Sequence, residues 1–384
     1  MPRIFFLAIG MFALGLDAYV VAGILPEIGK TFGTSDAINA QTVTAFTLCY
    51  AIAAPVFATL LVRKSVKKVL IGALLVFTIA NIASALSPDL HILLLSRALA
   101  GIGAGLFSPV AAAAAVAMVT PERKGRALSL ILGGMSTGTV IGVPFGLLLA
   151  QHFGWQSTLW LVTAIGLVGL IGIASGFPDI AVATPPSLKS RLSVMTNGRV
   201  AATVCVTFLT ALASLGLYTF IAPMLMNIAA ITQVTPYLWI WGIGGMLGSF
   251  TIGHLIDWSQ RPGWLLLAIL LLMSIALLCI PAAVTFGAPL AFLPFLIWGA
   301  TGWSSLAPQQ HTLLELQPQH GPAVVALNSS SNYLGGAVGV ILGGVLLSSG
   351  MGPEELSWYA GLIAIGALAG QLALVFSRPA RCIT

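Results

Sequence analysis

Two charged residues, Asp17 and Arg97, lie inside long apolar stretches, and their types suit them to chemistry within a membrane. The stretch GLDAYVVAG at 15–23 places Asp17 in an apolar run that extends from Ile4 to Pro26. A lone charged side chain at the centre of a bilayer costs roughly 2.5 to 3.5 kcal/mol on insertion scales. Carboxylates at this depth are typical of proton relays and substrate pathways. Asp17 is therefore the first candidate for a functional residue.

Arg97 is a cation at a depth where a charge is also costly. It belongs to the segment SRALAGIGAG at 96–105, inside a second apolar run. A guanidinium group stays charged at any physiological pH, so it must find a partner or water. Arg97 lies only a few residues from the preceding loop, so one alternative is that its side chain snorkels to the lipid headgroups. The other is a buried partner on another helix.

The elements that must position these charges are membrane-spanning helices. Of the 384 residues, 58% are hydrophobic and 7% are charged, whereas soluble proteins carry about 25% charged residues. A helix needs about 20 apolar residues to cross a bilayer, and the runs are continuous rather than alternating, which excludes a β-barrel. We predict twelve spans, at residues 4–25, 41–62, 69–87, 91–115, 126–150, 156–177, 201–226, 235–256, 264–284, 287–310, 323–348 and 357–377.

The basic residues predict the orientation of these spans. Fourteen Lys and Arg residues fall at the termini or in loops on the same side, whereas Lys30 falls on the opposite side. Because loops rich in Lys and Arg stay in the cytoplasm, both termini are predicted to be cytoplasmic. The same bias explains the net charge of +6, which therefore gives no argument for nucleic-acid binding. The first span is too long for a signal peptide, and the four scattered cysteines imply no disulfide or metal framework.

The longest polar connection divides the chain into two halves of six spans. It runs over residues 178–200, PDIAVATPPSLKSRLSVMTNGRV. We predict an N-terminal bundle at 1–177, a cytoplasmic linker at 178–200 and a C-terminal bundle at 201–384. A faint repeat with a register of about 195–199 residues supports two pseudo-symmetric six-helix bundles. The predicted fold class is thus an all-α integral membrane protein.

Four segments carry a resemblance to a known family. They are SRALAGIGAG at 96–105, GTVIGVPFG at 138–146, GHLIDWSQR at 253–261 and ALNSSSNYLGGAVGVILGG at 326–344. With YTFIAP at 218–223, the chain resembles the major facilitator superfamily. Within it, the chain is similar to the drug:proton antiporters that include bacterial sugar, nucleoside and chloramphenicol efflux permeases. The resemblance covers essentially the whole chain and implies the major facilitator fold.

In this family the arginine of the fourth span acts in proton coupling beside an acid of the first span, which the resemblance transfers to Arg97 and Asp17. The chemistry agrees, because burial and a nearby cation have opposite effects on the proton affinity of an acid. A conformational change can therefore make such an acid bind a proton on one side and release it on the other. The alternative is a structural ion pair that joins two helices.

The fifth-span segment GTVIGVPFG has both a packing and a family interpretation. Gly138, Gly142 and Gly146 recur every four residues, which makes a flat stripe that another helix can approach closely, and Pro144 adds a bend. In antiporters of the family, the motif is held to shape the cavity and to seal it against leak. The two interpretations are compatible.

The segment GHLID resembles the family's cytoplasmic gate loop, in which charge pairs link neighbouring helices. Here Gly253, Asp257 and Arg261 fit the motif, whereas the first-half copy keeps Arg63 but has Val62 in place of the aspartate. We therefore expect Asp257 to matter more for the inward-closed state than any residue of the second-to-third loop.

Candidate substrate contacts are polar and aromatic side chains at membrane depth. Asn328 and Asn332 are four residues apart and share a helix face, so their amides can bind a ligand or a neighbouring helix. Further cavity candidates are Tyr218, Trp298 and Trp303. The tryptophans near span ends predict an interfacial belt: Trp155, Trp239, Trp241, Trp258, Trp264 and Trp358.

These features favour a secondary transporter over an enzyme or a pump. The sequence has no Walker-type loop and no HExxH, and we expect no cofactor and no metal. The leading hypothesis is a proton-coupled antiporter in a bacterial cytoplasmic membrane that exports a small amphipathic or hydroxylated molecule. The alternative is facilitated diffusion or symport of a sugar or nucleoside, and a channel or an intramembrane enzyme is more remote. The expected partners are the substrate, protons and membrane lipid, and a monomer suffices.

Overall fold

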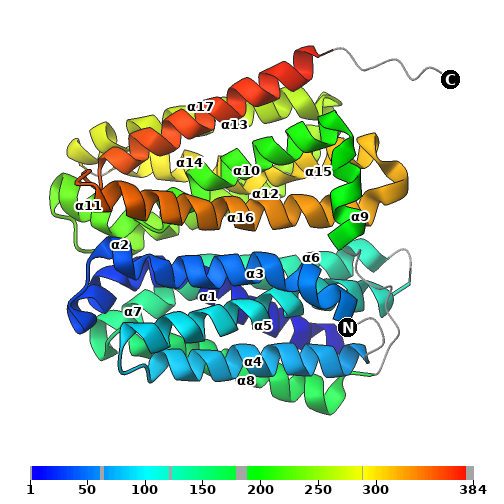
Figure 1. Ribbon diagram of the computed structural model, residues 1–384, viewed down its shortest axis with the longest axis horizontal. Coiled ribbons are helices and arrows are strands. Elements are labelled where there is room, and N and C mark those ends of the chain that lie inside the picture. Colours follow the sequence, from blue (N-terminus) through cyan, green and yellow to red (C-terminus); the bar gives the residue numbers. More distant parts are fainter. Residues whose placement is uncertain (1, 61–64, 121–122, 179–187, 288, 378–384) are drawn as a thin grey trace.

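The computed structural model describes residues 2–60, 65–120, 123–178, 188–287 and 289–377. Over these ranges the chain is a stack of long helices that run roughly parallel to one another (Figure 1). Short caps begin several of them: the Asp89 carboxylate accepts a hydrogen bond from the Ile92 amide at 2.9 Å, and Asn197 accepts from the amides of Arg199 and Val200. Such caps satisfy donors that a helix leaves free at its first turn.

The first half of the chain contains the helices shown in blue to green in Figure 1. They are α1 (Pro2–Phe32), α2 (Asp36–Asn39), α3 (Gln41–Leu60), α4 (Val66–Ala85), α5 (Leu90–Ala117), α6 (Lys124–Thr137), the π-helical η2 (Gly138–Gly142), α7 (Val143–Phe153) and α8 (Gln156–Gly176).

The second half follows a short connecting stretch, α9 (Leu188–Ser193) and η3 (Val194–Thr196). Its helices are α10 (Gly198–Tyr218), α11 (Ile221–Ala229), α12 (Thr235–Ser259), α13 (Pro262–Thr285), α14 (Phe292–Ser304), α15 (Leu306–Leu316), η4 (Pro318–His320), α16 (Gly321–Ser348) and α17 (Glu355–Phe376).

The twelve predicted spans agree with this helix order. Ten helical stretches of the described chain are long and apolar enough to cross a membrane. The second and tenth predicted spans correspond to α3 and to α14 with α15. The first helix is longer than predicted, because it continues through Pro26 to Phe32. A proline inside a membrane helix is tolerated where neighbouring groups satisfy the freed carbonyl.

The two halves repeat the same arrangement of neighbours. In the first half α1 packs against α6 and α8, α3 against α5, and α4 against α5 and α8. In the second half α10 packs against α16 and α17, α12 against α14, and α13 against α14 and α17. Each half is thus a six-span bundle, and the bundles lie one above the other in Figure 1. This confirms the predicted twelve-helix fold class.

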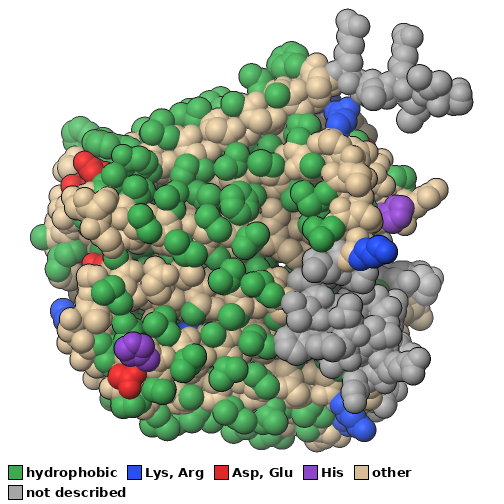
Figure 2. All heavy atoms as spheres, viewed as in Figure 1, with side chains coloured by type: hydrophobic (Ala, Val, Ile, Leu, Met, Phe, Trp, Pro, Cys, Tyr) green, Lys and Arg blue, Asp and Glu red, His purple; other side chains and the backbone are tan. Residues whose placement is uncertain are grey.

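The surface matches a protein that sits in a bilayer. Large apolar side chains such as Leu95, Ile171 and Phe250 are exposed on the flanks of the bundles, and Figure 2 shows apolar side chains across the whole visible flank. Lipid tails are as apolar as these side chains, so exposing the side chains to lipid costs no hydrophobic free energy.

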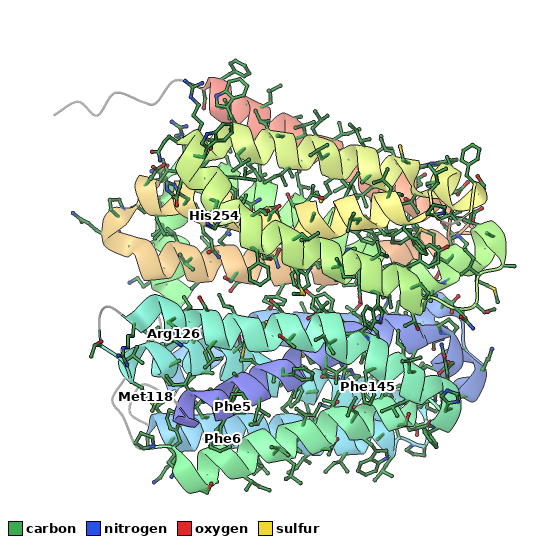
Figure 3. All side chains as sticks on the ribbon, turned by 180° about the vertical axis from the view of Figure 1, so that it is seen from behind. Phe5, Phe6, Met118, Arg126, Phe145 and His254 are labelled. Atoms are coloured by element: carbon green, nitrogen blue, oxygen red, sulfur yellow. The ribbon has the colours of Figure 1, made fainter. Side chains whose placement is uncertain are left out.

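Exposed basic side chains gather at the end of the molecule where α1 begins and α17 ends, on the right in Figures 1 and 2. Lys68, Arg123, Arg126 and Arg261 are exposed there. We call it the basic end. Arg126 on α6 and His254 on α12 lie toward this end in opposite bundles, on the left in Figure 3.

The predicted tryptophan belt is partly wrong. Trp239, Trp258, Trp264 and Trp358 are 41–84% exposed, as interfacial residues should be. Trp155 and Trp241, however, are buried. The Trp155 indole N–H donates to the Thr31 hydroxyl at 3.0 Å, and Trp241 packs among aromatic rings in the centre of the protein. Distance from a span end gives depth, but it does not give the face of the helix on which a residue lies.

Candidate functional site

A buried ion pair joins α1 to α5. The Arg97 Nη1 atom donates to the Asp17 Oδ1 atom at 2.6 Å, and the Nη2 atom lies 3.4 Å from the Asp17 carbonyl oxygen. Asp17 and Arg97 are 0% and 1% exposed. Of the two alternatives for Arg97, the structure shows the buried partner rather than snorkelling to the headgroups, since the guanidinium turns inward to a carboxylate 80 residues away in the sequence.

Two neutral groups complete the surroundings of the guanidinium. The Asn81 Oδ1 atom on α4 lies 3.4 Å from Arg97 Nη1, and the Phe46 ring on α3 lies with its centroid 4.6 Å from Arg97 Cζ. Four helices thus meet at this one cation. The second oxygen of Asp17, Oδ2, is buried and makes no hydrogen bond of normal geometry within the described chain, so it is the atom free to take a proton.

The residue two positions beyond Asp17 faces the other bundle. Tyr19 contacts Tyr218 of α10 and Trp241 of α12, with ring centroids 5.3 and 5.8 Å apart. Successive α-helical residues are about 100° apart, so residues two apart point to nearly opposite sides. Helix α1 therefore carries the ion pair on its inner face and an aromatic contact with the second bundle on the other face.

The aromatic candidates of the second bundle form one cluster. The Trp241 ring lies 4.4 Å from Tyr218, 6.1 Å from Trp298 and 5.6 Å from Trp303. Trp298 is fully buried and its indole N–H donates to the Ser214 hydroxyl at 2.8 Å. The structure therefore brings together all three predicted aromatic residues and adds Tyr19 and Trp241, which sequence reasoning missed. The buried Trp241 indole nitrogen has no hydrogen-bond partner within the described chain.

A second aromatic contact joins the bundles. The rings of Tyr50 on α3 and Tyr333 on α16 lie 4.1 Å apart. Contacts between the bundles also join α2 and α3 to α16, α1 to α11, and α7 with η2 to α12. Because α2 and α11 lie at the end opposite the basic end (Figure 1), the contacts of α2 with α16 and of α11 with α1 join the bundles at that end.

The two asparagines of α16 differ in their surroundings. Asn328 is 0% exposed, and its Oδ1 atom accepts a hydrogen bond from the Thr207 hydroxyl of α10 at 2.6 Å. Of the two roles considered for its amide, the structure therefore shows the bond to a neighbouring helix. Asn332, one turn further along, is half-buried and stays a candidate for a substrate contact.

The glycine motif lies where η2 meets α1. A methyl group added to Gly138 would fall 2.1 Å from the Phe12 carbonyl oxygen, and one on Gly146 would fall 2.9 Å from the Thr158 side chain. Gly142 also faces Phe12, while Pro144 is buried just beyond it. The motif thus provides the close helix approach that its spacing predicts. The hydrogen-bond pattern widens to a π-helix over Gly138–Gly142, a local form that is frequent at functional sites.

The predicted gate residues lie at the basic end and are not paired with each other. Gly253, Asp257 and Arg261 are exposed, and no ion pair between Asp257 and Arg261 occurs within the described chain. Arg63 falls outside the described residues. In the part of the chain that the structure describes, no cluster of three metal-ligating side chains occurs.

Comparisons with known proteins agree with this architecture. The sequence profile of the Major Facilitator Superfamily matches residues 7–321. The chain is 27% identical over 374 residues to the inner membrane transport protein YdhP of Escherichia coli (strain K12), covering 96% of this chain and 93% of the relative. It is also 27% identical over 346 residues to a chloramphenicol resistance protein of Streptomyces lividans, covering 84% of this chain and 88% of the relative.

Solved structures show the same fold. A D-xylose–proton symporter superimposes with a TM-score of 0.79 at 16% identity, covering 98% of each chain. The xylose transporter XylE of E. coli superimposes with a TM-score of 0.77 at 15% identity, covering 100% of this chain and 99% of that one.

Two six-span bundles, together with these relatives, define a multi-pass membrane transporter rather than an enzyme. The chain belongs to the Major Facilitator Superfamily.

Proposed function

We propose that this protein is a proton-coupled antiporter that exports a small amphipathic or hydroxylated molecule across a bacterial cytoplasmic membrane. The observation that carries the proposal is the buried pair of Asp17 and Arg97, with one carboxylate oxygen free of hydrogen bonds in the described chain. A charge pair that is fully withdrawn from water is costly to maintain, so its retention suits a residue that must bind and release a proton.

Proton exchange at Asp17 supplies the energy for export. An inward-moving proton gains about 2.3 kcal/mol per 100 mV of membrane potential, enough to concentrate a neutral substrate roughly tens-fold. In the cycle, Asp17 takes up a proton from outside and releases it to the cytoplasm when the pathway opens inward. The described contacts between the bundles lie at the centre and at the end opposite the basic end, which supports an inward-facing arrangement if the basic end is cytoplasmic.

The substrate is proposed to bind between the bundles, beside the aromatic cluster. Tyr218, Trp298 and Trp303 offer apolar ring surface, and Trp241 offers a buried N–H donor without a partner in the described chain. Asn332 would supply an amide. Rings with one hydrogen-bond donor suit an amphipathic molecule. The similarity to a chloramphenicol resistance protein and to an inner membrane transport protein supports export and the cytoplasmic membrane.

Gating is proposed to involve Gly253, Asp257 and Arg261 at the basic end, with each bundle moving as a unit, and Arg63, which lies outside the described residues. The bundle boundaries at 177 and 201, cytoplasmic termini and a monomeric pathway belong to the same proposal.

Purified protein in liposomes tests the function. With a pH gradient and a panel of candidate substrates, protons should move only when the right substrate is present. Substrate movement that is equally fast after the gradient is collapsed would instead identify a facilitated-diffusion carrier. Substrate and protons that move in the same direction would identify a symporter.

A further inference from the structure

Three neutral acceptors surround the Arg97 guanidinium, and one of them, the Asn81 side chain, also lies beside the Asp17 carboxyl. The Asn81 Oδ1 atom and the Asp17 carbonyl oxygen each lie 3.4 Å from a guanidinium nitrogen, and the Phe46 ring lies 4.6 Å from Cζ. None of these groups changes its charge when Asp17 gains a proton. Two of them, Asn81 and Phe46, are side chains that the proposed proton cycle does not use.

Both side chains are fixed in place. The Asn81 Nδ2 atom donates to the Phe77 carbonyl at 3.0 Å, so the amide must present its oxygen, an acceptor, to Arg97. The backbone that carries the Phe46 ring lies close against α5, because a methyl group on Gly101 would fall 2.2 Å from the Phe46 carbonyl oxygen. Asn81 and Phe46 are 0% and 2% exposed, so water does not replace them.

The charge balance at the site explains why such acceptors are needed. When Asp17 is ionised, its charge neutralises Arg97. When Asp17 is protonated, Arg97 becomes a buried cation without an anion, which is unfavourable. A hydrogen-bond acceptor and the negative face of a ring then lower the free energy of that state. The acceptor and the ring stabilise Arg97 more when Asp17 is protonated, because the guanidinium then has no carboxylate partner.

We propose that Asn81 and Phe46 are positioning residues that hold Arg97 while Asp17 carries a proton, and that they thereby set the pH at which the pair is protonated. The proposal rests on the proton-coupled function proposed above.

The other groups around the pair do not offer a competing titration. Arg97 is the charged group that acts on Asp17, and the neutral Asn81 side chain acts on the same carboxyl. Of the tyrosines on neighbouring positions, Tyr19 faces Tyr218 in the other bundle, and Tyr50, one turn from Phe46 on α3, faces Tyr333. On the side of α6 and η2, Thr139 donates to the Gly15 carbonyl.

Variants at positions 81 and 46 should shift the pH of protonation in opposite directions. Asn81 lies beside both the Arg97 guanidinium and the Asp17 carboxyl, so removing its amide affects both charge states, whereas the Phe46 ring faces the guanidinium and gives the direct test. Asn81→Asp adds a carboxylate beside Asp17, so the pair should take up a proton at a higher pH than in the wild type. Phe46→Leu should shift protonation to lower pH by about half a unit.

The matched control is Thr78→Val. Thr78 lies on the same helix, one turn before Asn81, is buried, and donates only to the Leu74 carbonyl at 2.7 Å in the described structure. It should leave the pH of protonation unchanged.

Two measurements keep this inference separate from the proposed function. The first is the melting temperature as a function of pH, in which the inflection due to Asp17 is the one that Asp17→Asn abolishes. The second is substrate-dependent proton flux in liposomes as a function of external pH.

A lower inflection for Phe46→Leu and a higher one for Asn81→Asp support the positioning role, and an inflection that Phe46→Leu leaves unmoved overturns it. A variant that only loosens the fold would lower the melting temperature without moving the inflection. If the wild type shows the inflection but no substrate-dependent proton flux, the antiport function fails and the positioning role stands.

Discussion

Replacing Asp17 with asparagine should destabilise the folded protein by about 3 kcal/mol and abolish substrate-dependent proton flux. Breaking a buried pair by removing one partner typically costs about 3 to 5 kcal/mol, because the remaining charge is left uncompensated. The cost should fall at the lower end here. The new amide can still accept from Arg97 Nη1, which now lies 2.6 Å from the carboxylate, and Asn81 and Phe46 remain in contact with the guanidinium.

The double variant Asp17→Asn with Arg97→Met provides the decisive comparison. Removing both charges relieves the uncompensated cation, so the double variant should be more stable than Asp17→Asn alone and close to the wild type. Unfolding of the purified protein in detergent gives the free energies, and the cycle of four proteins gives the interaction energy of the pair.

Two outcomes of these measurements would contradict the argument from the structure. If the destabilisation of the two single variants simply adds in the double variant, the residues do not interact as the structure shows. If Asp17→Asn retains proton flux at the wild-type rate, the proton is carried elsewhere, and the antiport mechanism is wrong even where the stability result holds.

Three further predictions concern other parts of the molecule. Gly138→Ala should destabilise the protein by about 1 to 3 kcal/mol through overpacking against Phe12 and should reduce transport. The control is Gly133→Ala, where the added methyl group meets open space. In melting and flux assays, this control should keep the stability and the transport rate of the wild type. Asp257→Asn should slow transport with little effect on melting, because the exposed carboxylate has no ion pair in the described chain and acts when the basic end closes. Normal transport by this variant would refute the gate role. Burial raises the pKa of Asp36 above its ordinary value of 3.8, so the stability it contributes at low pH is lost as pH rises through the raised pKa. The Asp36→Asn variant should therefore have a higher melting temperature than the wild type at pH 7 and the same melting temperature as the wild type at about pH 3.

Much of the fold could be predicted because hydropathy locates helices along the chain. Continuous apolar runs fix the number and order of spans, and the register of the repeat predicts two bundles. The pairing of Asp17 with Arg97 was also predictable, since a buried carboxylate and a buried guanidinium each need a partner.

The faces of the helices were harder to predict. Trp241 lies six residues into α12, at a depth compatible with an interfacial belt, yet it packs against Tyr218 and Tyr19. Membrane helices are apolar on all sides, so they lack the periodic signal that reveals the buried face of a soluble helix. Tyr19 was missed for the same reason.

Asn81 offered a signal that could have been used. An amide within an otherwise apolar span, in the segment FTIANIASA at 77–85, is a polar group that must be satisfied inside the protein. Sequence alone could not assign its partner, because the contact with Arg97 depends on the crossing of α4 and α5.

The link between the first and fourth spans exists in both bundles, but with different chemistry. In the first bundle it is the ion pair of Asp17 and Arg97, and in the second it is the hydrogen bond from Trp298 to Ser214, on α14 and α10. The second link joins two neutral groups that do not titrate near physiological pH. Under the proposed antiport mechanism, low pH therefore weakens the contact between the first and fourth spans of the first bundle, whereas the corresponding contact of the second bundle does not change with pH.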